Sequence, residues 1–162
     1  FTPKSMLRLK AAASPIESFT DNQVRAVIDD RRLTDRSKVR RILLCSGKIT
    51  WDLIGKREAG AEAGEFEHDE VAVIRLERLY PLPENELKSI LAEYPADAEL
   101  VWVQEEPENQ GAWSYLLLNL YPKLKTDLRA ITRAPSASTA TGSHKFHELE
   151  QAQVVEAAFS NL

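Results

Sequence analysis

Six cations lie within eleven residues near the beginning of the sequence, opposed there only by Asp35. Such a density of positive charge raises the local potential and favours a polyanion, for example the phosphates of a nucleotide or of coenzyme A. The simpler interpretation is a solvated loop whose charges pair with acidic residues elsewhere, as most charge runs do, and we favour it. The anion site stays open as the alternative. The six cations are Arg31, Arg32, Arg36, Lys38, Arg40 and Arg41.

A second candidate is the tripeptide Ser46, Gly47 and Lys48, which follows an apolar run typical of a buried strand. Where a strand turns into a helix, backbone N–H groups and the helix dipole can hold an anion. Phosphate loops need several glycines for close backbone approach, and neither the dinucleotide nor the P-loop glycine pattern is present. The tripeptide therefore favours a plain strand-to-helix turn, with Ser46 as the N-cap of the helix.

Three carboxylates, Glu105, Glu106 and Glu108, follow the third predicted strand. At the carboxyl edge of a parallel sheet, adjacent carboxylates could form an acid–base pair or bind a divalent cation. No histidine neighbours them in the sequence. We therefore expect these residues to place charge at a helix N-terminus, or to hydrogen-bond across a domain boundary, rather than to catalyse.

The sequence has three histidines and one cysteine. His144 and His147 could share one helix face, but no third metal ligand is apparent, so capping or interface roles are favoured for them and for His68. Cys45 lies inside a buried-type strand, where a thiol is an inert small hydrophobe. We predict no catalytic residue and no metal ligand in this chain.

Four apolar runs predict strands, and helical periodicity separates them. The run that ends at Ser46 is apolar on both faces, as a buried parallel strand requires. Strands joined by helical crossovers predict a three-layer α/β/α fold with a mostly parallel sheet. A short helix is expected from Asp21 through Ile28, and Asn109 is expected to cap a later helix. The predicted strands span residues 39–46, 71–74, 100–103 and 128–132, and longer helices follow Ser46, Pro83, Asn109 and Gly142.

Composition places the chain among globular proteins. Its 162 residues suit one domain, and 43% hydrophobic with 28% charged residues can fill a core. No apolar run approaches the ~20 residues of a membrane span. Residues 1–41 carry 10 Lys and Arg against 5 Asp and Glu, whereas residues 42–162 carry 11 against 20. The acidic body argues against a nucleic-acid partner, and the single cysteine indicates a reducing, cytoplasmic setting.

The beginning of the chain predicts a piece of a longer protein, because Phe1 follows no initiator Met, basic leader or signal segment. Residues 1–20 mix prolines, small residues and scattered apolar residues without a sustained period. We interpret them as a linker from a preceding domain. Residues 21–162 then form the α/β domain.

Four segments carry a family resemblance: FTPKSMLR (residues 1–8), RLERLYPLP (75–83), VWVQEEPENQGAW (101–113) and ASTATGSHKFH (137–147). With these segments the chain closely resembles the C-terminal, transketolase-type third domain of the decarboxylating component of 2-oxoglutarate dehydrogenase. The likeness spans essentially the whole chain, and residues 104–113 are very specific. Residues 138–147 are most similar to the actinobacterial branch, whose long multifunctional chains carry a fused succinyltransferase-type domain.

The resemblance implies a tricarboxylic acid cycle enzyme that uses thiamine diphosphate and Mg²⁺ to decarboxylate 2-oxoglutarate and passes the succinyl group to lipoamide. It also implies a homodimer, lipoyl-bearing acyltransferase partners, activation by acetyl-CoA and control by a small forkhead-associated protein. The Gly-Asp-Gly motif that holds the diphosphate and the metal in such enzymes is missing here. We therefore expect this chain alone to be inactive and not to bind the cofactor, and to buttress the dimer and shape an effector pocket.

Such a pocket would explain the six cations of residues 31–41, which we call the basic segment. As a hypothesis, Arg36, Lys38, Arg40 and Arg41 include ligands for the phosphates of an acyl-CoA effector. The alternative function is a freestanding flavodoxin-like or receiver-like binding module, although a receiver needs acidic residues just after its first strand, where Cys45 stands. A small independent hydrolase or transferase would need a reactive constellation, and none is apparent.

Overall fold

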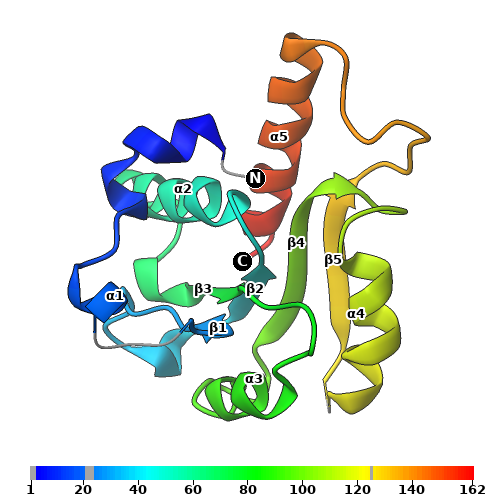
Figure 1. Cartoon of the computed structure of the whole chain (residues 1–162). Helices are drawn as coiled ribbons and strands as arrows, with labels where there is room; N and C mark the ends of the chain where they lie inside the picture. The colour runs from blue at the N-terminus through cyan, green and yellow to red at the C-terminus, as the bar shows by residue number, and fades with distance from the viewer. Residues whose placement is uncertain (1–2, 21–23, 125) are drawn as a thin grey trace.

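The chain folds around a five-stranded sheet with the strand order β1-β3-β2-β4-β5 (Figure 1). The computed structural model describes residues 3–20, 24–124 and 126–162. Four strands run parallel, and β1 pairs antiparallel with β3 at one edge, so the expected mostly parallel sheet is confirmed. The strands are β1 Val27–Ile28, β2 Arg41–Cys45, β3 Val71–Leu76, β4 Glu99–Pro107 and β5 Leu128–Arg133.

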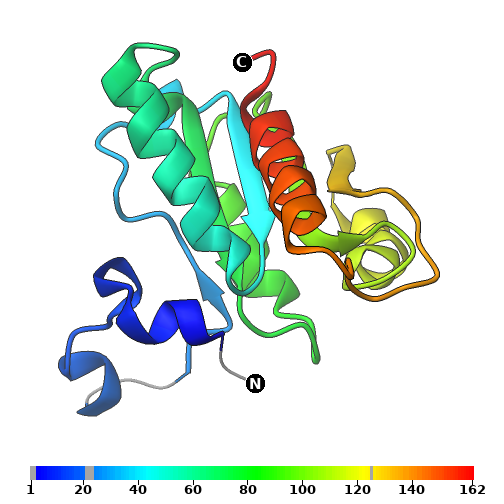
Figure 2. The same cartoon turned by 90° about the horizontal axis from the view of Figure 1, so that it is seen from above.

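Helices cover both faces of the sheet, which confirms the three-layer prediction. All five residues of the central strand β2 are buried, because successive side chains point to opposite faces and both faces are covered. Leu43 and Cys45 pack in the cluster formed with α2 and α5, whereas Ile42 and Leu44 belong to the cluster of α3 and α4. Seen from above, α2 and α5 lie on one side of the sheet (Figure 2). The helices are α2 Ile49–Ala63, α3 Glu84–Leu91, α4 Trp113–Asn119 and α5 His144–Phe159.

Helix α5 extends past the end of the sheet (Figure 1). Its C-terminal half buries Val154, Ala158 and Phe159, whereas Phe146 and Leu149 near its N-terminus are more than half exposed. In the described part of the chain, no helix is both long enough and apolar enough to cross a membrane.

None of the described residues among the first twenty belongs to the core. They form two 3-10 turns, η1 Lys4–Arg8 and η2 Lys10–Ala12, and the short helix α1 Glu17–Thr20, none of which has a buried residue. Residues 1–2 lie outside the described residues. The interpretation of this segment as a linker stays a prediction.

The helix expected from Asp21 through Ile28 is wrong in its described part. Residues 21–23 lie outside the described residues, and Val27–Ile28 form the edge strand β1. The backbone explains the difference, because the N–H groups of Glu77 and Arg78 donate to the carbonyl of Ala26 and extend the pairing with β3. A strand of two residues is too short to show a period in the sequence.

The start of α2 also differs from the expectation. Ser46 is not the N-cap, because the helix begins at Ile49 after Lys48. Gly47 has a φ of 76°, a left-handed conformation that glycine adopts without steric cost. The resulting turn separates β2 from the helix and moves the N-cap from the expected Ser46 to Lys48, two residues along the chain.

Strand β4 is longer than its apolar run. The expectation that Glu105 and Glu106 follow the strand is wrong, because β4 continues through them to Pro107 across an irregularity in its pairing with β5. Asn109 does not cap α4, whose N-cap is Ala112. The Asn109 amide instead donates to the Ser136 carbonyl at 3.0 Å and accepts from the Ser136 N–H at 3.0 Å.

The carboxylate of Asp69 fastens the basic segment to the sheet. Asp69 lies in the 3-10 turn η4 (His68–Glu70) directly before β3 and accepts hydrogen bonds from the backbone N–H groups of Thr34 and Asp35, at 3.2 and 2.8 Å. The Thr34 hydroxyl and the His68 ring also bond to it. Burial by itself would raise the pKa of Asp69, but the hydrogen bonds from Thr34 and His68 hold that pKa well below its ordinary value.

A buried amide, that of Gln104 on β4, shapes the loop that leads to α4. Its Oε1 accepts from the Trp102 indole at 2.9 Å and from the Trp113 backbone N–H at 3.0 Å. Its Nε2 donates to the carbonyls of Pro107 and Gln110, at 3.0 and 2.8 Å. A Cβ on Gly111, whose φ is 66°, would lie 3.0 Å from the same amide. The position of the Gln104 amide therefore requires a glycine at residue 111.

Asp69→Asn should lower the free energy of unfolding by about 2–3 kcal/mol at pH 7, because it weakens hydrogen bonds to a charged acceptor. The folded-state pKa of Asp69 lies below the unfolded value of about 3.9, so its contribution is present above that pH and is lost as the pH falls further. Urea unfolding from pH 7 to pH 2 measures this. The difference between wild type and variant should shrink below about pH 4.

The exposed Asp97, whose side chain forms no hydrogen bond or ion pair with any described residue, provides the control. Asp97→Asn should change the free energy of unfolding by no more than about 0.5 kcal/mol. A gap between wild type and Asp69→Asn that stays constant down to pH 2 would contradict the assigned role of the ionised carboxylate.

Gln104→Ala should destabilise the fold by about 2–4 kcal/mol, because the indole of Trp102 and the N–H of Trp113 lose a buried acceptor. Gln153→Ala on the exposed face of α5 is the matched control and should stay within about 0.5 kcal/mol. Chemical denaturation compares the two. Equal midpoints for both variants would refute the role given to the Gln104 amide.

Candidate functional site

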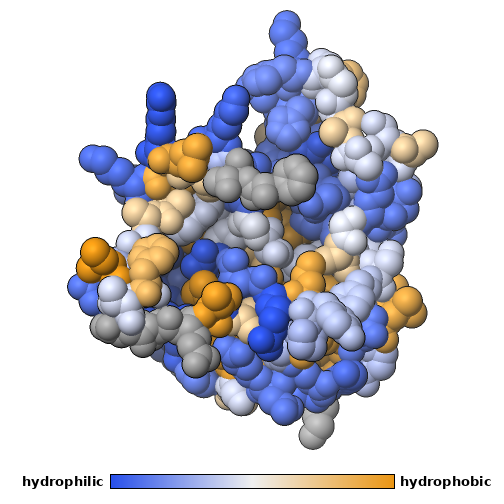
Figure 3. Space-filling model, in the orientation of Figure 1, coloured by the Kyte–Doolittle hydropathy of each residue, from blue (hydrophilic) through white to orange (hydrophobic). Residues whose placement is uncertain are grey.

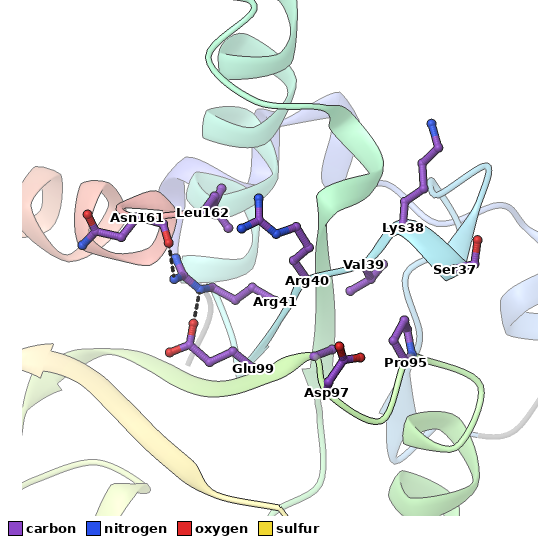
Figure 4. Close-up of a pocket in the computed structure, with 11 residues that line it drawn as sticks. Ser37, Lys38, Val39, Arg40, Arg41, Pro95, Asp97, Glu99, Asn161 and Leu162 are labelled. Atoms are coloured by element: carbon purple, nitrogen blue, oxygen red, sulfur yellow. Dashed lines mark hydrogen bonds and ion pairs between the residues drawn. The ribbon is translucent and has the colours of Figure 1, made fainter.

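Three of the four cations predicted to hold phosphates line one pocket. The pocket lies at the amino ends of β2 and β4, beside the last residues of the chain, and encloses about 370 Å³ (Figure 4). Lys38, Arg40 and Arg41 are on its wall, together with the carboxylates of Asp97 and Glu99. Arg36 is not among its lining residues. The pocket is therefore polar and of mixed charge.

Arg41 is held as part of the fold. Its side chain is 6% exposed, and its Nε donates to Glu99 Oε2 at 2.6 Å. Its Nη1 donates to the carbonyls of Ala158 and Ser160, at 2.9 and 2.8 Å, and Nη2 approaches the Asn161 carbonyl at 3.4 Å. The last carbonyls of a helix lack helical partners, so the guanidinium satisfies the C-terminal end of α5. Figure 4 shows it pointing toward Glu99 and Asn161.

Lys38 and Arg40 are available to solvent. Their side chains are 52% and 59% exposed, and each has one carboxylate partner. The Lys38 Nζ lies 3.0 Å from Glu67 Oε2, a contact that raises the pKa of the lysine. The Arg40 Nη1 lies 3.2 Å from Glu70 Oε1. Exposed pairs of this kind contribute about 0–1 kcal/mol, so an arriving anion could displace either carboxylate at small cost.

Arg36 lies on the 3-10 turn η3 (Arg36–Lys38) and is not part of the pocket wall. It forms ion pairs with Asp29 and with Glu93, and its guanidinium lies 5.5 Å from the ring centre of Tyr94. Two carboxylates and an aromatic ring already surround it. In this structure Arg36 connects the basic segment to the turn after α3.

At the carboxyl edge of the sheet, the turn of residues 46–48 contacts a glutamate at the end of β4. The Lys48 ammonium lies 3.1 Å from Glu105 Oε1 and 3.4 Å from Asp52 Oδ2. Burial would lower the pKa of Lys48, but Glu105 and then Asp52 raise it above its ordinary value. The turn after β2 and the end of β4 are therefore joined by an ion pair. Glu105 has a cationic partner, which does not favour a free acid–base pair there.

The three histidines have different partners. The two ring nitrogens of His68 face Asp69 at 2.9 Å and Glu58 at 3.2 Å. His147 Nδ1 lies 3.1 Å from an Arg133 guanidinium nitrogen, whereas the exposed His144 contacts Glu148 at 3.4 Å. Within the described residues, no group of three or more His, Cys, Asp or Glu is arranged to hold a metal ion.

Cys45 is fully buried on β2. Burial raises the pKa of its thiol to about 12, and its Sγ lies 3.3 Å from the Thr50 hydroxyl. A thiol needs its thiolate form and access to react. Cys45 therefore has the features of a core residue.

Sequence reasoning missed the acidic partners of the basic segment. These carboxylates lie 7 to 58 residues away from their cations and carry no local signal that identifies them. The only sequence-level indication was the charge imbalance between the first 41 residues and the remainder. The partners are Asp29, Glu67, Glu70, Glu93 and Glu99.

Comparison with known proteins gives the family of this fold. The family model described as 2-oxoglutarate dehydrogenase C-terminal matches residues 13–159. The chain is 42% identical, over 98% of its length, to the multifunctional 2-oxoglutarate metabolism enzyme of Mycolicibacterium vanbaalenii, and 40% identical, over 98%, to the 2-oxoglutarate dehydrogenase E1/E2 component of Corynebacterium glutamicum. It is 41% identical, over 99%, to the E1 component of Cupriavidus necator.

The chain spans 13%, 13% and 16% of the lengths of these three relatives. The resemblance expected from the four sequence segments is thereby confirmed, in bacteria of more than one group. The chain belongs to the 2-oxoglutarate dehydrogenase C-terminal family.

Proposed function

We propose that this chain serves as the C-terminal assembly and regulatory domain of an enzyme that decarboxylates 2-oxoglutarate oxidatively and transfers the succinyl group to lipoamide in the tricarboxylic acid cycle. The family match over residues 13–159 is the observation that carries the proposal. The site geometry supports a role without catalytic residues, because the thiol of Cys45 is buried and Lys48 neutralises Glu105.

The cofactor of such an enzyme would be thiamine diphosphate with Mg²⁺, which supplies the carbanion-stabilising chemistry when bound. Magnesium prefers oxygen ligands in near-octahedral geometry. The chain has no Gly-Asp-Gly motif, and its described residues offer no cluster of carboxylates for the ion. These residues do not fit the cofactor, so its site would belong to other domains of the enzyme.

Assembly with other domains is supported by apolar side chains left at the surface. Leu117 and Leu118 on α4, and Phe146 and Leu149 on α5, are large hydrophobic residues that are exposed. Exposed apolar patches on a folded domain mark contacts with partners. We propose that the partners are the remainder of the enzyme, a second subunit, lipoyl-bearing acyltransferase components and a forkhead-associated regulatory protein, all in the cytoplasm.

The effector of this domain would be an acyl-CoA such as acetyl-CoA. Its phosphates would bind in the pocket of Figure 4, with Lys38 and Arg40 as the exchangeable ligands. Arg41 would keep the pocket in shape through its hydrogen bonds to the end of α5. Arg36 would fix the basic segment through its ion pairs with Asp29 and Glu93. A phosphate carries more negative charge than a carboxylate and can therefore displace Glu67 and Glu70.

The 162-residue chain alone should neither bind thiamine diphosphate with Mg²⁺ nor turn over 2-oxoglutarate. The full-length enzyme should bind the cofactor and turn over 2-oxoglutarate, because the cofactor ligands would lie in its other domains. Titration calorimetry and an assay for released CO₂ measure the two properties. Turnover by the isolated chain would contradict the supporting role.

Lys38→Ala combined with Arg40→Ala should raise the acetyl-CoA concentration needed for half-maximal activation of the full-length enzyme by at least about tenfold. Each lost charged hydrogen bond contributes about 1.5–3 kcal/mol, and about 1.4 kcal/mol is a factor of ten. Basal turnover should be unchanged. Steady-state rates measured over a range of acetyl-CoA concentrations test this.

Lys88→Ala combined with Lys123→Ala is the matched control. These two exposed lysines share Glu84 as their partner on α3, so the control removes the same charge without touching the pocket. Its activation curve should follow that of the wild type. Equal activation of the Lys38/Arg40 variant and the wild type would reject these residues as effector ligands.

A further inference from the structure

A second cavity lies between the N-terminal segment and the sheet. It encloses about 400 Å³, within the range of small-molecule pockets, and shares no lining residue with the pocket of Figure 4. Its walls come from residues 11–15, 18 and 19, from residues on either side of β1, from the first turns of α2 and from β3. Polar and apolar groups contribute to the lining in similar measure. We propose that this cavity binds a small organic phosphate whose ester group is aromatic or apolar.

The positive charge of the cavity comes from arginines that have no carboxylate partner in the described part of the chain. Of the cations with described positions around it, Arg25, Arg31 and Arg32 form no ion pair with any described residue. The two carboxylates on the wall are already engaged: Asp29 pairs with Arg36, and Asp30 pairs with the buried Arg57. The cavity therefore keeps a local excess of positive charge.

An indole ring holds two guanidinium groups in place. The Arg32 guanidinium lies 5.7 Å and the Arg75 guanidinium 5.3 Å from the ring centre of Trp51, so each makes a cation–π contact. Stacking restricts a long side chain without neutralising its charge. Arg75 also pairs with Glu77 at 3.4 Å, so Arg32 is the stacked group that has no carboxylate partner among the described residues. A ligand then loses less free energy in ordering these groups, which is the benefit of preorganisation.

The apolar side of the cavity would contact the aromatic or apolar ester group of the ligand. Phe19 and Val24 are 76% and 92% exposed, and Ile28 and Ile54 line the same space. Figure 3 shows hydrophobic surface over α1 and the N-terminal turns, at the left of this face, with hydrophilic groups between. An aromatic or aliphatic group placed there would cover surface that water now contacts.

The number of arginines favours a phosphate monoester over a carboxylate. A monoester carries about −1.5 to −2 charges at pH 7 and has three acceptor oxygens, so it can engage more than one guanidinium at once. A single carboxylate carries one charge and suits one bidentate arginine. Phenyl phosphate is a small probe that joins a phosphate monoester to an aromatic ring.

The experiment follows the three indole N–H signals by two-dimensional NMR while phenyl phosphate is added, with Trp51→Phe identifying the Trp51 signal. Phenyl phosphate should shift the Trp51 signal saturably, whereas inorganic phosphate and phenol should each bind at least about tenfold more weakly, since each lacks one half of the recognition. Equal affinity for phenyl phosphate and inorganic phosphate, or no saturable shift, would overturn the proposal.

Arg31→Ala combined with Arg32→Ala should weaken phenyl phosphate binding by at least about tenfold. Lys88→Ala combined with Lys123→Ala removes the same charge on α3 and η5 (Tyr121–Lys123) and should bind within about twofold of the wild type. Thermal unfolding midpoints verify that the variants are folded, and the two single arginine variants provide the comparison if the double variant is not. Wild-type affinity in the arginine variants would refute the site.

Discussion

The buried guanidinium of Arg41 joins parts of the chain that lie far apart in the sequence. It ties the central strand to Glu99 on β4 and to the carbonyl of Ala158, 117 residues further on. Arginine suits this place because its donors form a rigid planar fork, which can satisfy several acceptors at once. The end of α5 is thereby fixed beside the amino edge of the sheet. The pocket at that edge exists because this contact holds its two sides together.

The remaining cations of the basic segment differ in what holds them. Lys38 and Arg40 are paired with exposed carboxylates, contacts that water and salt weaken. Arg32 is placed by the Trp51 ring and has no carboxylate in the described part of the chain. One run of positive charge in the sequence therefore becomes three kinds of group: a structural clamp, a set of exchangeable pairs and cations that keep their full charge.

Local sequence patterns predicted the elements whose burial is two-sided or periodic. The run through Leu43 and Leu44 indicated a central strand because both of its faces had to be apolar, and the spacing around Leu87 indicated α3. The pattern could not predict β1, which has two residues, or the role of Asn109, whose partner Ser136 is 27 residues away. The candidate site followed the same division, since charge density located the cations but no local signal located their carboxylates.

The way a cation is held determines which anions it can take. A lysine paired with a glutamate exchanges one anion for another, so the gain is only the difference between the two and falls as salt competes. The Arg32 guanidinium, stacked on the Trp51 indole, has no carboxylate partner among the described residues to give up when an anion arrives, and its orientation is already set. The pocket at Lys38 therefore suits a multiply charged ligand that out-competes carboxylates. The cavity at Trp51 suits a smaller anion whose apolar group supplies the rest of the contact.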